Sequence, residues 1–435
     1  MCFGKDKKYP VILLSLREMN RNIILLLSFL LLGLVSCGGE SRVVLGDERT
    51  DLYYPLVRGR RIAVLSNQSG IVGDKVVSGG IAERYRGGDR SLVPFGDPVT
   101  GPHIVDVLIA DGMDVRAIFS PEHGFRGGAD AGEHVDSSVD EETGVEILSL
   151  YSKGSYLPSA ESMDKFDVLL VDIQDVGLRY YTYYVTMHHL MEACAAYGKK
   201  CIILDRPNPN GMYVDGPILD MQYKSGIGYL PITTVHGMTL GELALMIKGE
   251  GWMEGAEQLD LEVVPLLNYT HRTRYELIWR PSPNLKDMKS IYLYASTCYF
   301  EGTVVTAGRG TEFPFEVYGH PDYPAGDFSF IPRSIPGAKS PRYMDRICNG
   351  VDLRGIPDDE IIGRGIDFSY VIDAYSKLDI GDAFFPGRHF ELEAGQGYVR
   401  EMIESGCSAD DLKRRWAPDV EAFLVQRRPY LLYEE

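Results

Sequence analysis

The sequence predicts an α/β protein built on a mostly parallel sheet. From Arg61 to Leu266, short apolar or β-branched runs alternate with segments of helical period, an order typical of parallel strands joined by crossover helices. Most of these runs are continuously apolar, as strands covered on both faces are. The 435 residues exceed what one hydrophobic core usually organises, so we expect a second domain beginning near Leu266.

Six strands and three crossover helices account for the alternation. The strands are predicted at residues 62–65, 115–119, 145–148, 168–171, 201–204 and 261–265. The helices are predicted at residues 103–113, 182–197 and 239–252, where apolar side chains recur at three- and four-residue spacing. Gly198 is the expected end of the second helix. Beyond Leu266 the order is less regular, and a helical tail is predicted over residues 394–427.

The N-terminal segment has the pattern of an export signal. Two arginines precede an apolar run at residues 23–34, which is too short to span a bilayer comfortably. The run leads into Leu-Val-Ser-Cys-Gly at residues 34–38, which resembles a bacterial lipobox. We therefore expect residues 1–36 to be a lipoprotein signal peptide, Cys37 to carry the lipid and residues 37–58 to be a linker. The protein is predicted to be a membrane-anchored lipoprotein that faces the periplasm.

The composition excludes a disordered chain and disfavours nucleic acid as a partner. The chain has 44 basic against 62 acidic residues, a formal net charge of −18, and 45% hydrophobic residues. This negative charge repels phosphate backbones. Five cysteines follow Cys37, an odd number without C-x-x-C pairing, which indicates neither a disulfide framework nor a zinc knuckle.

Polar residues follow three of the predicted strands. They occupy residues 120–127, 172–183 and 205–211. Ligands of open parallel sheets bind beyond the carboxyl ends of the strands, so these segments are expected to converge on one cleft. Carboxylates on segments one or two strands apart fall within the separation that glycosidases use for an acid and its partner. Sugar hydrolysis is therefore geometrically feasible.

Three acidic residues and a histidine of these segments are candidates for catalysis or binding. Glu122, between a proline and His123, is expected on a bent loop as a catalytic carboxylate, and the alternative is a carboxylate bonded to local amides. His123 either orients the acid and binds substrate or is a hydrogen-bonded loop residue. Asp172 and Asp175 bind sugar hydroxyls, assist catalysis or cap the following helix. For Asp172 a structural role is favoured.

Two arginines of the same segments are candidates for binding a ligand carboxylate. Arg179 and Arg206 each offer paired hydrogen bonds that lysine cannot reproduce. The alternative is a structural ion pair with Asp172, Asp175 or Asp205, and for Arg206 this alternative is favoured.

Three later segments are also expected to reach the cleft. They begin at His236, at Trp279 and at Gly308. Trp279 is either an aromatic platform or a domain-packing residue. In the third segment Arg309 lies among glycines, where backbone approach is unhindered, and Glu316 follows as a second candidate for a cleft acid.

Other chemistries have little support. The sequence contains no G-x-x-x-x-G-K-[ST], no G-x-S-x-G and no G-x-G-x-x-G after the first strand. Residues 122–134 and the pair His188-His189 contain metal-binding residue types without a recognised ligand spacing, and adjacent helical histidines are expected to point in different directions. No metal site is predicted.

Seven motifs together resemble the exo-β-N-acetylmuramidase (NamZ) family. They are Ser-Pro-Glu-His-Gly at 120–124, Asp-Ile-Gln-Asp-Val-Gly at 172–177, Tyr-Thr-Tyr at 181–183, Asp-Arg-Pro-Asn-Pro at 205–209, His-Gly-Met-Thr-Leu-Gly-Glu-Leu-Ala at 236–244, Pro-Ser-Pro-Asn at 281–284 and Gly-Arg-Gly-Thr at 308–311. In this order they cover nearly all of the chain after Cys37.

The resemblance implies a Rossmann-like catalytic domain at residues 59–266 and a smaller auxiliary α/β domain at residues 267–435. It implies release of terminal N-acetylmuramic acid from peptidoglycan-derived disaccharides or muropeptides, with Glu122 as the general acid and no cofactor. Asp175, Glu316 or a tyrosine is expected to complete the catalytic group. The expected substrate contacts are His123, Arg179, Tyr181, Tyr183, Arg206, Asn208, His236, Asn284 and Arg309.

N-Acetylmuramic acid carries a lactyl carboxylate, for which Arg179 or Arg309 is the expected partner. Two alternatives stay open beside this interpretation. One is a non-catalytic lipoprotein that binds cell-wall sugars. The other is a metal-assisted hydrolase that removes acyl or peptide groups from muropeptides.

Overall fold

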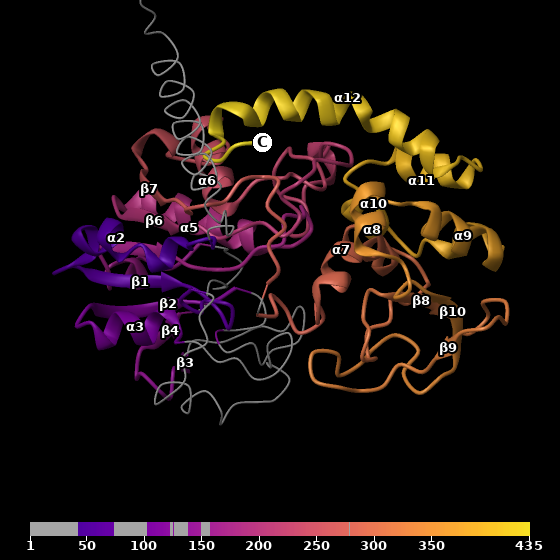
Figure 1. Ribbon diagram of the computed structural model, residues 1–435, viewed down its shortest axis with the longest axis horizontal. Helices are drawn as coiled ribbons and strands as arrows, with labels where there is room; N and C mark the ends of the chain where they lie inside the picture. The colour runs from indigo at the N-terminus through magenta and orange to yellow at the C-terminus, as the bar shows by residue number, and fades with distance from the viewer. Residues whose placement is uncertain (1–41, 74–101, 122–124, 126–137, 149–156, 278) are drawn as a thin grey trace, which may run out of the picture. The chain divides into compact units, whose positions relative to one another are not determined.

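The computed structural model describes residues 42–73, 102–121, 125, 138–148, 157–277 and 279–435 (Figure 1). Val44–Glu435 forms one compact unit. Among the described residues, no helix combines the length and the apolar character needed to cross a bilayer. The five cysteines after Cys37 are unpaired.

A seven-stranded sheet forms the larger part of this unit. Its order is β3-β4-β2-β1-β5-β6-β7, and every neighbouring pair is parallel except β3 with β4. The strands are β1 Arg61–Leu65, β2 Asp114–Phe119, β3 Ser138–Val139, β4 Glu146–Leu148, β5 Val168–Val171, β6 Lys200–Leu204 and β7 Asp260–Val264. The six predicted strands are confirmed. The two-residue β3 was not predicted, because so short a strand has no apolar period of its own.

Different helices cover the two faces of this sheet. In β5, Val168 and Leu170 pack in one core with side chains of α2 and α3, whereas Leu169 and Val171 pack in another with those of α5 and α6. These helices, labelled in Figure 1, are α2 Thr50–Val57, α3 Ile104–Ala110, α5 Tyr183–Tyr197 and α6 Leu240–Gly249, and α4 Ala160–Met163 is a single turn. Burial on both faces is the reason that the strands are continuously apolar.

Local signals set the ends of these helices. α5 ends at Gly198, whose φ of 61° is the left-handed conformation that glycine adopts most easily, as predicted. α6 begins after Thr239, where the Thr239 hydroxyl accepts from the Glu242 amide and the Glu242 carboxylate accepts from the Thr239 amide.

A second, smaller sheet is antiparallel, with the order β8-β10-β9. Its strands are β8 Val317–His320, β9 Ser329–Phe330 and β10 Cys348–Asp352. The helices of this part are α7 Met288–Thr297, α8 Asp358–Arg364, α9 Ser369–Leu378, α10 His389–Ala394, α11 Tyr398–Glu404 and α12 Ala409–Arg427. The α/β class, with a mostly parallel central sheet and a smaller second domain, is therefore confirmed.

The C-terminal segment after α12 returns to the large sheet. The Tyr433 hydroxyl donates to Asp205 Oδ2 (2.6 Å) in the loop after β6, and the Leu266 amide donates to the same hydroxyl (2.9 Å). This segment therefore holds the loop after β6 in place.

Candidate active site

The order of the strands creates a switch point beside β1. The chain adds β2 on one side of β1 and later adds β5 on the other side. Loops that leave two such strands diverge, and the crevice between them is the usual ligand site of open α/β sheets. The loops at the carboxyl ends of β1, β5 and β6 are called strand tips below, and they comprise residues 66–70, 172–177 and 205–211.

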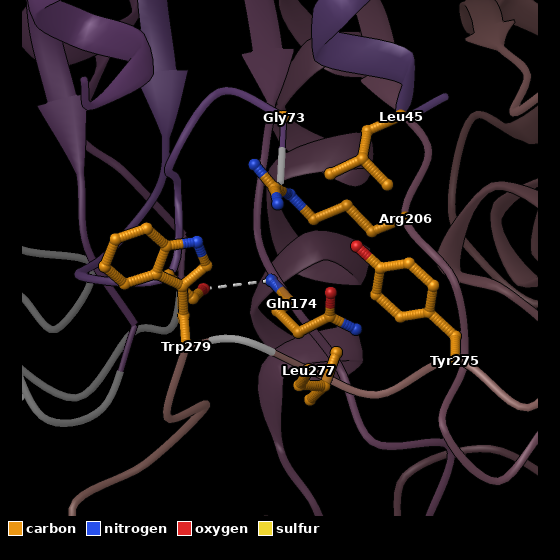
Figure 2. Close-up of a pocket in the computed structure, with 8 residues that line it drawn as sticks. Leu45, Gly73, Gln174, Arg206, Tyr275, Leu277 and Trp279 are labelled. Atoms are coloured by element: carbon orange, nitrogen blue, oxygen red, sulfur yellow. Dashed lines mark hydrogen bonds between the residues drawn. The ribbon is translucent and has the colours of Figure 1, made fainter. Parts of the chain in front are cut away.

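A small pocket lies at this switch point and is called the strand-tip pocket. The empty space between its lining atoms, open solvent included, amounts to about 250 Å³. Figure 2 shows Trp279 and Tyr275 on opposite sides of it, with Gln174 and Arg206 between them. The remaining lining residues are Leu45, Ser69, Gly73 and Leu277.

Hydrogen bonds join the three strand tips. The Ser69 hydroxyl of the β1 tip donates to Asn67 Oδ1 (2.6 Å). The same hydroxyl accepts from the backbone amide of Gln174 in the β5 tip (3.0 Å), the bond drawn as a dashed line in Figure 2. The Gln174 side chain donates to the Pro207 carbonyl of the β6 tip (2.7 Å). The tips of β1, β5 and β6 therefore form one connected structure around the pocket.

In the segment that follows β2, residues 120, 121 and 125 are described, whereas residues 122–124 and 126–137 are not. β2 pairs with β1, and Ser120 and Pro121, which follow it, are buried. The predicted residues Glu122 and His123 lie outside the described residues, as does the predicted lipidation site Cys37.

Asp175 is a buried carboxyl group of the β5 tip, with 6% of its surface exposed. Its Oδ1 accepts from the Gly177 amide (2.6 Å), whereas its Oδ2 has no hydrogen-bond partner among the described residues. Burial raises its pKa to about 7, and bonds from the Gly177 and Val176 amides offset only part of this shift. A carboxyl group that titrates near neutral pH is suited to proton transfer.

Asp175→Asn is expected to change how stability depends on pH. Because the folded-state pKa is raised from 3.8 to about 7, the stabilisation is full below the unfolded value and is lost as the pH rises through about 7. Asn keeps the acceptor for Gly177 without titrating. Measured by urea titration from about pH 4 to about pH 8, the free energy of unfolding of the variant should therefore rise relative to that of the wild type by on the order of 4 kcal/mol. Parallel pH profiles of the two proteins would contradict this expectation.

Arg206 lies between two buried carboxyl groups. Its Nε and Nη2 donate to Asp172 (2.6 and 2.9 Å), and Nη2 also donates to Asp47 (2.7 Å). Burial lowers the pKa of the guanidinium, but the two carboxylates outweigh this effect and hold the pKa above its ordinary value. The structural ion pair with Asp172 is therefore present, and Asp47 is a second partner that the sequence analysis missed. Asp172 does not cap α5, whose N-cap is Thr182.

Arg179 is fully buried among backbone carbonyls. Its Nη1 donates to Pro217 (2.7 Å) and Ile232 (2.9 Å), and its Nη2 donates to Glu393 (3.2 Å) and Ala394 (2.8 Å). The last two carbonyls end α10, where the helix dipole is negative. This corrects the expectation of a ligand clamp or an aspartate partner, because all four Nη hydrogens are already donated to the backbone.

Tyr181 and Tyr183 support a wall of the pocket. Both hydroxyls donate to the Pro281 carbonyl (2.8 and 2.9 Å), to which Gln68 Nε2 also donates (3.1 Å). The segment that carries Trp279 is thereby tied to the β1 tip and to the start of α5. In this structure the two tyrosines hold that segment in place through their hydrogen bonds.

Asn208 and Asn284 bond to nearby backbone. Asn208 Nδ2 donates to the Met238 carbonyl (2.9 Å), and its Oδ1 accepts from the Asn210 amide (2.8 Å). Asn284 Nδ2 donates to the Gly337 carbonyl (2.8 Å). Asn208 therefore shapes the β6 tip, and Asn284 holds the end of the segment that begins at Trp279.

His236 lies beside the β5 tip. Its amide donates to the Gly177 carbonyl (3.4 Å), and its Nδ1 accepts from the Met238 amide (3.2 Å). Burial and the charge of Arg427 lower its pKa to about 3, so the ring is neutral and Nε2 carries the hydrogen. That donor has no partner among the described residues.

Arg309 and Glu316 are not among the residues that line the strand-tip pocket within the described chain. Arg309 pairs with Glu301 and lies over the Phe315 ring, 4.9 Å from its centroid. Burial raises the pKa of Glu316 to about 7, and the charge of Asp287 adds to this shift. No described contact joins either residue to the strand tips.

The β1 tip, Gln174 and Tyr275 were not predicted from the sequence as parts of the site, and neither was Asp47. The rule applied to the other strands would have found the tip, because Ser66-Asn67-Gln68-Ser69 follows the apolar run 62–65. Several polar atoms on and around the tips have no hydrogen-bond partner among the described residues, and they are Asn67 Nδ2, Gln68 Oε1, Asp175 Oδ2, His236 Nε2 and Trp279 Nε1. Donors, acceptors and an aromatic wall in one small region are suited to a polar ligand with an apolar face.

The pocket at the switch point has aromatic walls, the buried Asp175 follows its lining residue Gln174 in the chain, and the sequence has no nucleotide-binding motif; this combination suits an α/β enzyme that acts on sugars. The chain belongs to the exo-β-N-acetylmuramidase NamZ family: residues 97–289 match the N-terminal model of that family and residues 292–433 match its C-terminal model. It is accordingly a glycosidase, and the resemblance drawn from the seven motifs is confirmed.

Individual relatives agree with this assignment. The chain is 35% identical over 347 residues to the peptidoglycan β-N-acetylmuramidase NamZ of Bacillus subtilis strain 168, a match that covers 76% of this chain and 82% of that protein. A crystal structure of a DUF1343 family protein from Bacteroides fragilis is 52% identical, with a TM-score of 0.79, and the match covers 91% of this chain and all of that one. A second such protein from the same organism, at 24% identity and a TM-score of 0.72, has the same fold over 90% of this chain and 99% of its own.

Proposed function

We propose that this protein is an exo-acting glycosidase that releases terminal N-acetylmuramic acid from peptidoglycan fragments, with Glu122 as the general acid. Its family and its relatives support the reaction. The observation that carries the assignment of the site is the junction of three strand tips around the pocket. Asp175, whose pKa burial raises to about 7, lies on one of these tips next to the lining residue Gln174.

The strand order supports a pair of carboxyl groups. Glu122 belongs to the loop after β2, and Asp175 belongs to the loop after β5, with β1 between the two strands. Two strand spacings amount to about 10 Å between the strand ends, and side chains that lean toward each other close this to the separation that glycosidases use. We propose Glu122 as the acid for the departing oxygen and Asp175 as its partner.

The pocket lining supports a sugar ligand. Trp279 and Tyr275 offer aromatic faces for the apolar side of a pyranose ring, and the Gln174 side-chain oxygen offers an acceptor for its hydroxyls, because both Nε2 hydrogens are donated to the Asp175 and Pro207 carbonyls. Of the three predicted arginines, Arg206 lines this pocket, so we propose it, in place of Arg179 or Arg309, as the group that faces the lactyl carboxylate.

Incubation with a disaccharide of N-acetylmuramic acid linked to N-acetylglucosamine tests the proposal. Mass spectrometry of the products should show the two free sugars. An unchanged disaccharide that nonetheless binds would instead identify a sugar-binding lipoprotein. Chelator-sensitive loss of an acyl or peptide group from a muropeptide would identify a metal-assisted hydrolase.

We propose in addition that Cys37 anchors the protein to a membrane that borders the periplasm. The order of two arginines, an apolar run and a lipobox-like segment supports this. In cells labelled with radioactive palmitate, wild-type protein should incorporate label and sediment with membranes, whereas Cys37→Ser should do neither. Label in both proteins would contradict the anchor.

A further inference from the structure

Helix α5, labelled in Figure 1, carries a cluster of polar side chains that are not among the residues lining the strand-tip pocket. His188, His189 and Glu192 each place one ligand atom within 4.8 Å of the others. Glu192 follows His189 by three residues and His188 by four, and residues at both spacings are neighbours on a helix surface. The expectation that the adjacent histidines point in different directions is therefore wrong, because both rings reach the same carboxylate.

The distances in this cluster are those between the ligands of a metal ion. The Nδ1 atoms of His188 and His189 lie 3.6 and 3.4 Å from Glu192 Oε2. An N–H···O hydrogen bond is shorter, about 2.9 Å. Two ligand atoms bound at about 2.05 Å to a tetrahedral ion are about 3.3 Å apart. Both separations match a coordination edge, and the His189–Glu192 separation is also that of a long hydrogen bond.

The tautomer of His188 is set by the Trp252 carbonyl. Nε2 of His188 lies 3.0 Å from this carbonyl, which can only accept, so Nε2 carries the hydrogen. Nδ1 then presents a lone pair to the Glu192 carboxylate and has no hydrogen-bond partner among the described residues. The His188 side chain is only 1% exposed. Two facing lone pairs repel each other unless a cation lies between them.

Backbone groups of one loop orient two of the three side chains. The Trp252 carbonyl holds His188, and the Glu254 amide donates to Glu192 Oε1 (3.2 Å), which leaves Oε2 directed to the cluster. Tyr229 packs edge-on against both imidazole rings, with 4.9 Å between centroids in each pair. Outer partners of this kind fix the orientation of metal-binding side chains.

We propose that His188, His189 and Glu192 bind a Zn²⁺ ion or a similar divalent transition metal, with water as the fourth ligand. Two imidazoles and one carboxylate are a ligand set that zinc takes in three-residue sites. The side chains of His189 and Glu192 are 10% and 17% exposed, so the ion has a path from solvent. The positive charge of Lys224 acts on His188 and opposes the binding of a cation there. A bound ion fixes the His188 and Glu192 side chains, which bond to the backbone of Trp252 and Glu254, and so it stabilises the fold.

Metal content and metal-dependent stability of the tag-free protein test the site. Wild type should bind one equivalent of Zn²⁺ more than His188→Gln or Glu192→Gln, measured by elemental mass spectrometry after dialysis. Zn²⁺, but not Mg²⁺, should raise the Tm of the wild type by several degrees. Glu192→Gln keeps its size and the acceptor for Glu254, so it should fold, and its Zn²⁺ affinity should fall by at least about 100-fold, since loss of a ligand exceeds loss of an outer partner.

His320→Gln is the matched control, because His320 is a partly buried histidine outside the cluster. It should bind Zn²⁺ as the wild type does. Equal zinc content and equal Tm response in the wild type, His188→Gln and Glu192→Gln would overturn the proposal. A Co²⁺-loaded wild type without the absorption bands of tetrahedral Co²⁺, or with bands that Glu192→Gln retains, would also overturn it.

Discussion

Glu122→Gln should lower the turnover of the muramic acid disaccharide by about 100-fold or more, the usual contribution of a positioned general acid. Glutamine keeps the size of the side chain but has no proton for the departing glycosidic oxygen. The loss should appear in kcat, because substrate binding does not require the transferred proton. Initial rates of N-acetylmuramic acid release, followed by mass spectrometry, measure the effect.

Two comparisons show whether Glu122→Gln loses activity because the acid is missing or because the protein is misfolded. Glu421→Gln changes an exposed carboxylate on α12 and should keep the wild-type rate. A nitrophenyl glycoside, whose leaving group needs little protonation, should lose less activity in Glu122→Gln than the disaccharide loses. Wild-type rates of Glu122→Gln on the disaccharide would refute the assignment.

Arg206→Met should lower the free energy of unfolding by about 3–5 kcal/mol, because it leaves a buried charge without its partner. Asp172 and Asp47 are both fully buried, and the guanidinium of Arg206 bonds to each of them. Methionine fills much of the same volume, so the loss of unfolding free energy is due to the missing charge more than to a cavity. Urea unfolding at neutral pH measures it.

Arg61→Met is the matched control for this variant. Arg61 pairs with Asp167 at 2.6 Å, but the two side chains are 43% and 42% exposed. Water screens an exposed pair, so its removal should cost far less than removal of Arg206. Equal losses of unfolding free energy in the two variants would show that the buried ion pair stabilises the fold no more than the exposed pair does.

The fold was largely predictable because its signals are local. The strands at residues 168–171 and 201–204 are apolar throughout, and burial on both faces of a parallel sheet requires this. Gly198 ends α5 through its own backbone conformation. The short strand β3 lacked such a signal, since two residues have no period.

The sequence predicted which residues lie at the strand ends, but it did not predict which groups those residues contact. The sequence predicts Asp175 as a site residue because it follows a strand, and the structure shows a buried carboxyl group on the β5 tip. Arg179 was chosen by the same rule, yet its partners include Glu393 and Ala394, more than two hundred residues away in the chain. Asp47, the second partner of Arg206, precedes all of the predicted strands.

The amino-acid sequence alone establishes the α/β class, the polar strand ends and membership of a family of muramidases, because burial pattern and motif order are properties of short segments. Only the tertiary structure shows that β1 lies between β2 and β5, that Arg179 is bound by carbonyls, and that two adjacent histidines meet one glutamate. A buried charge takes whichever partner the packing brings near, and that packing joins segments that are distant in the chain.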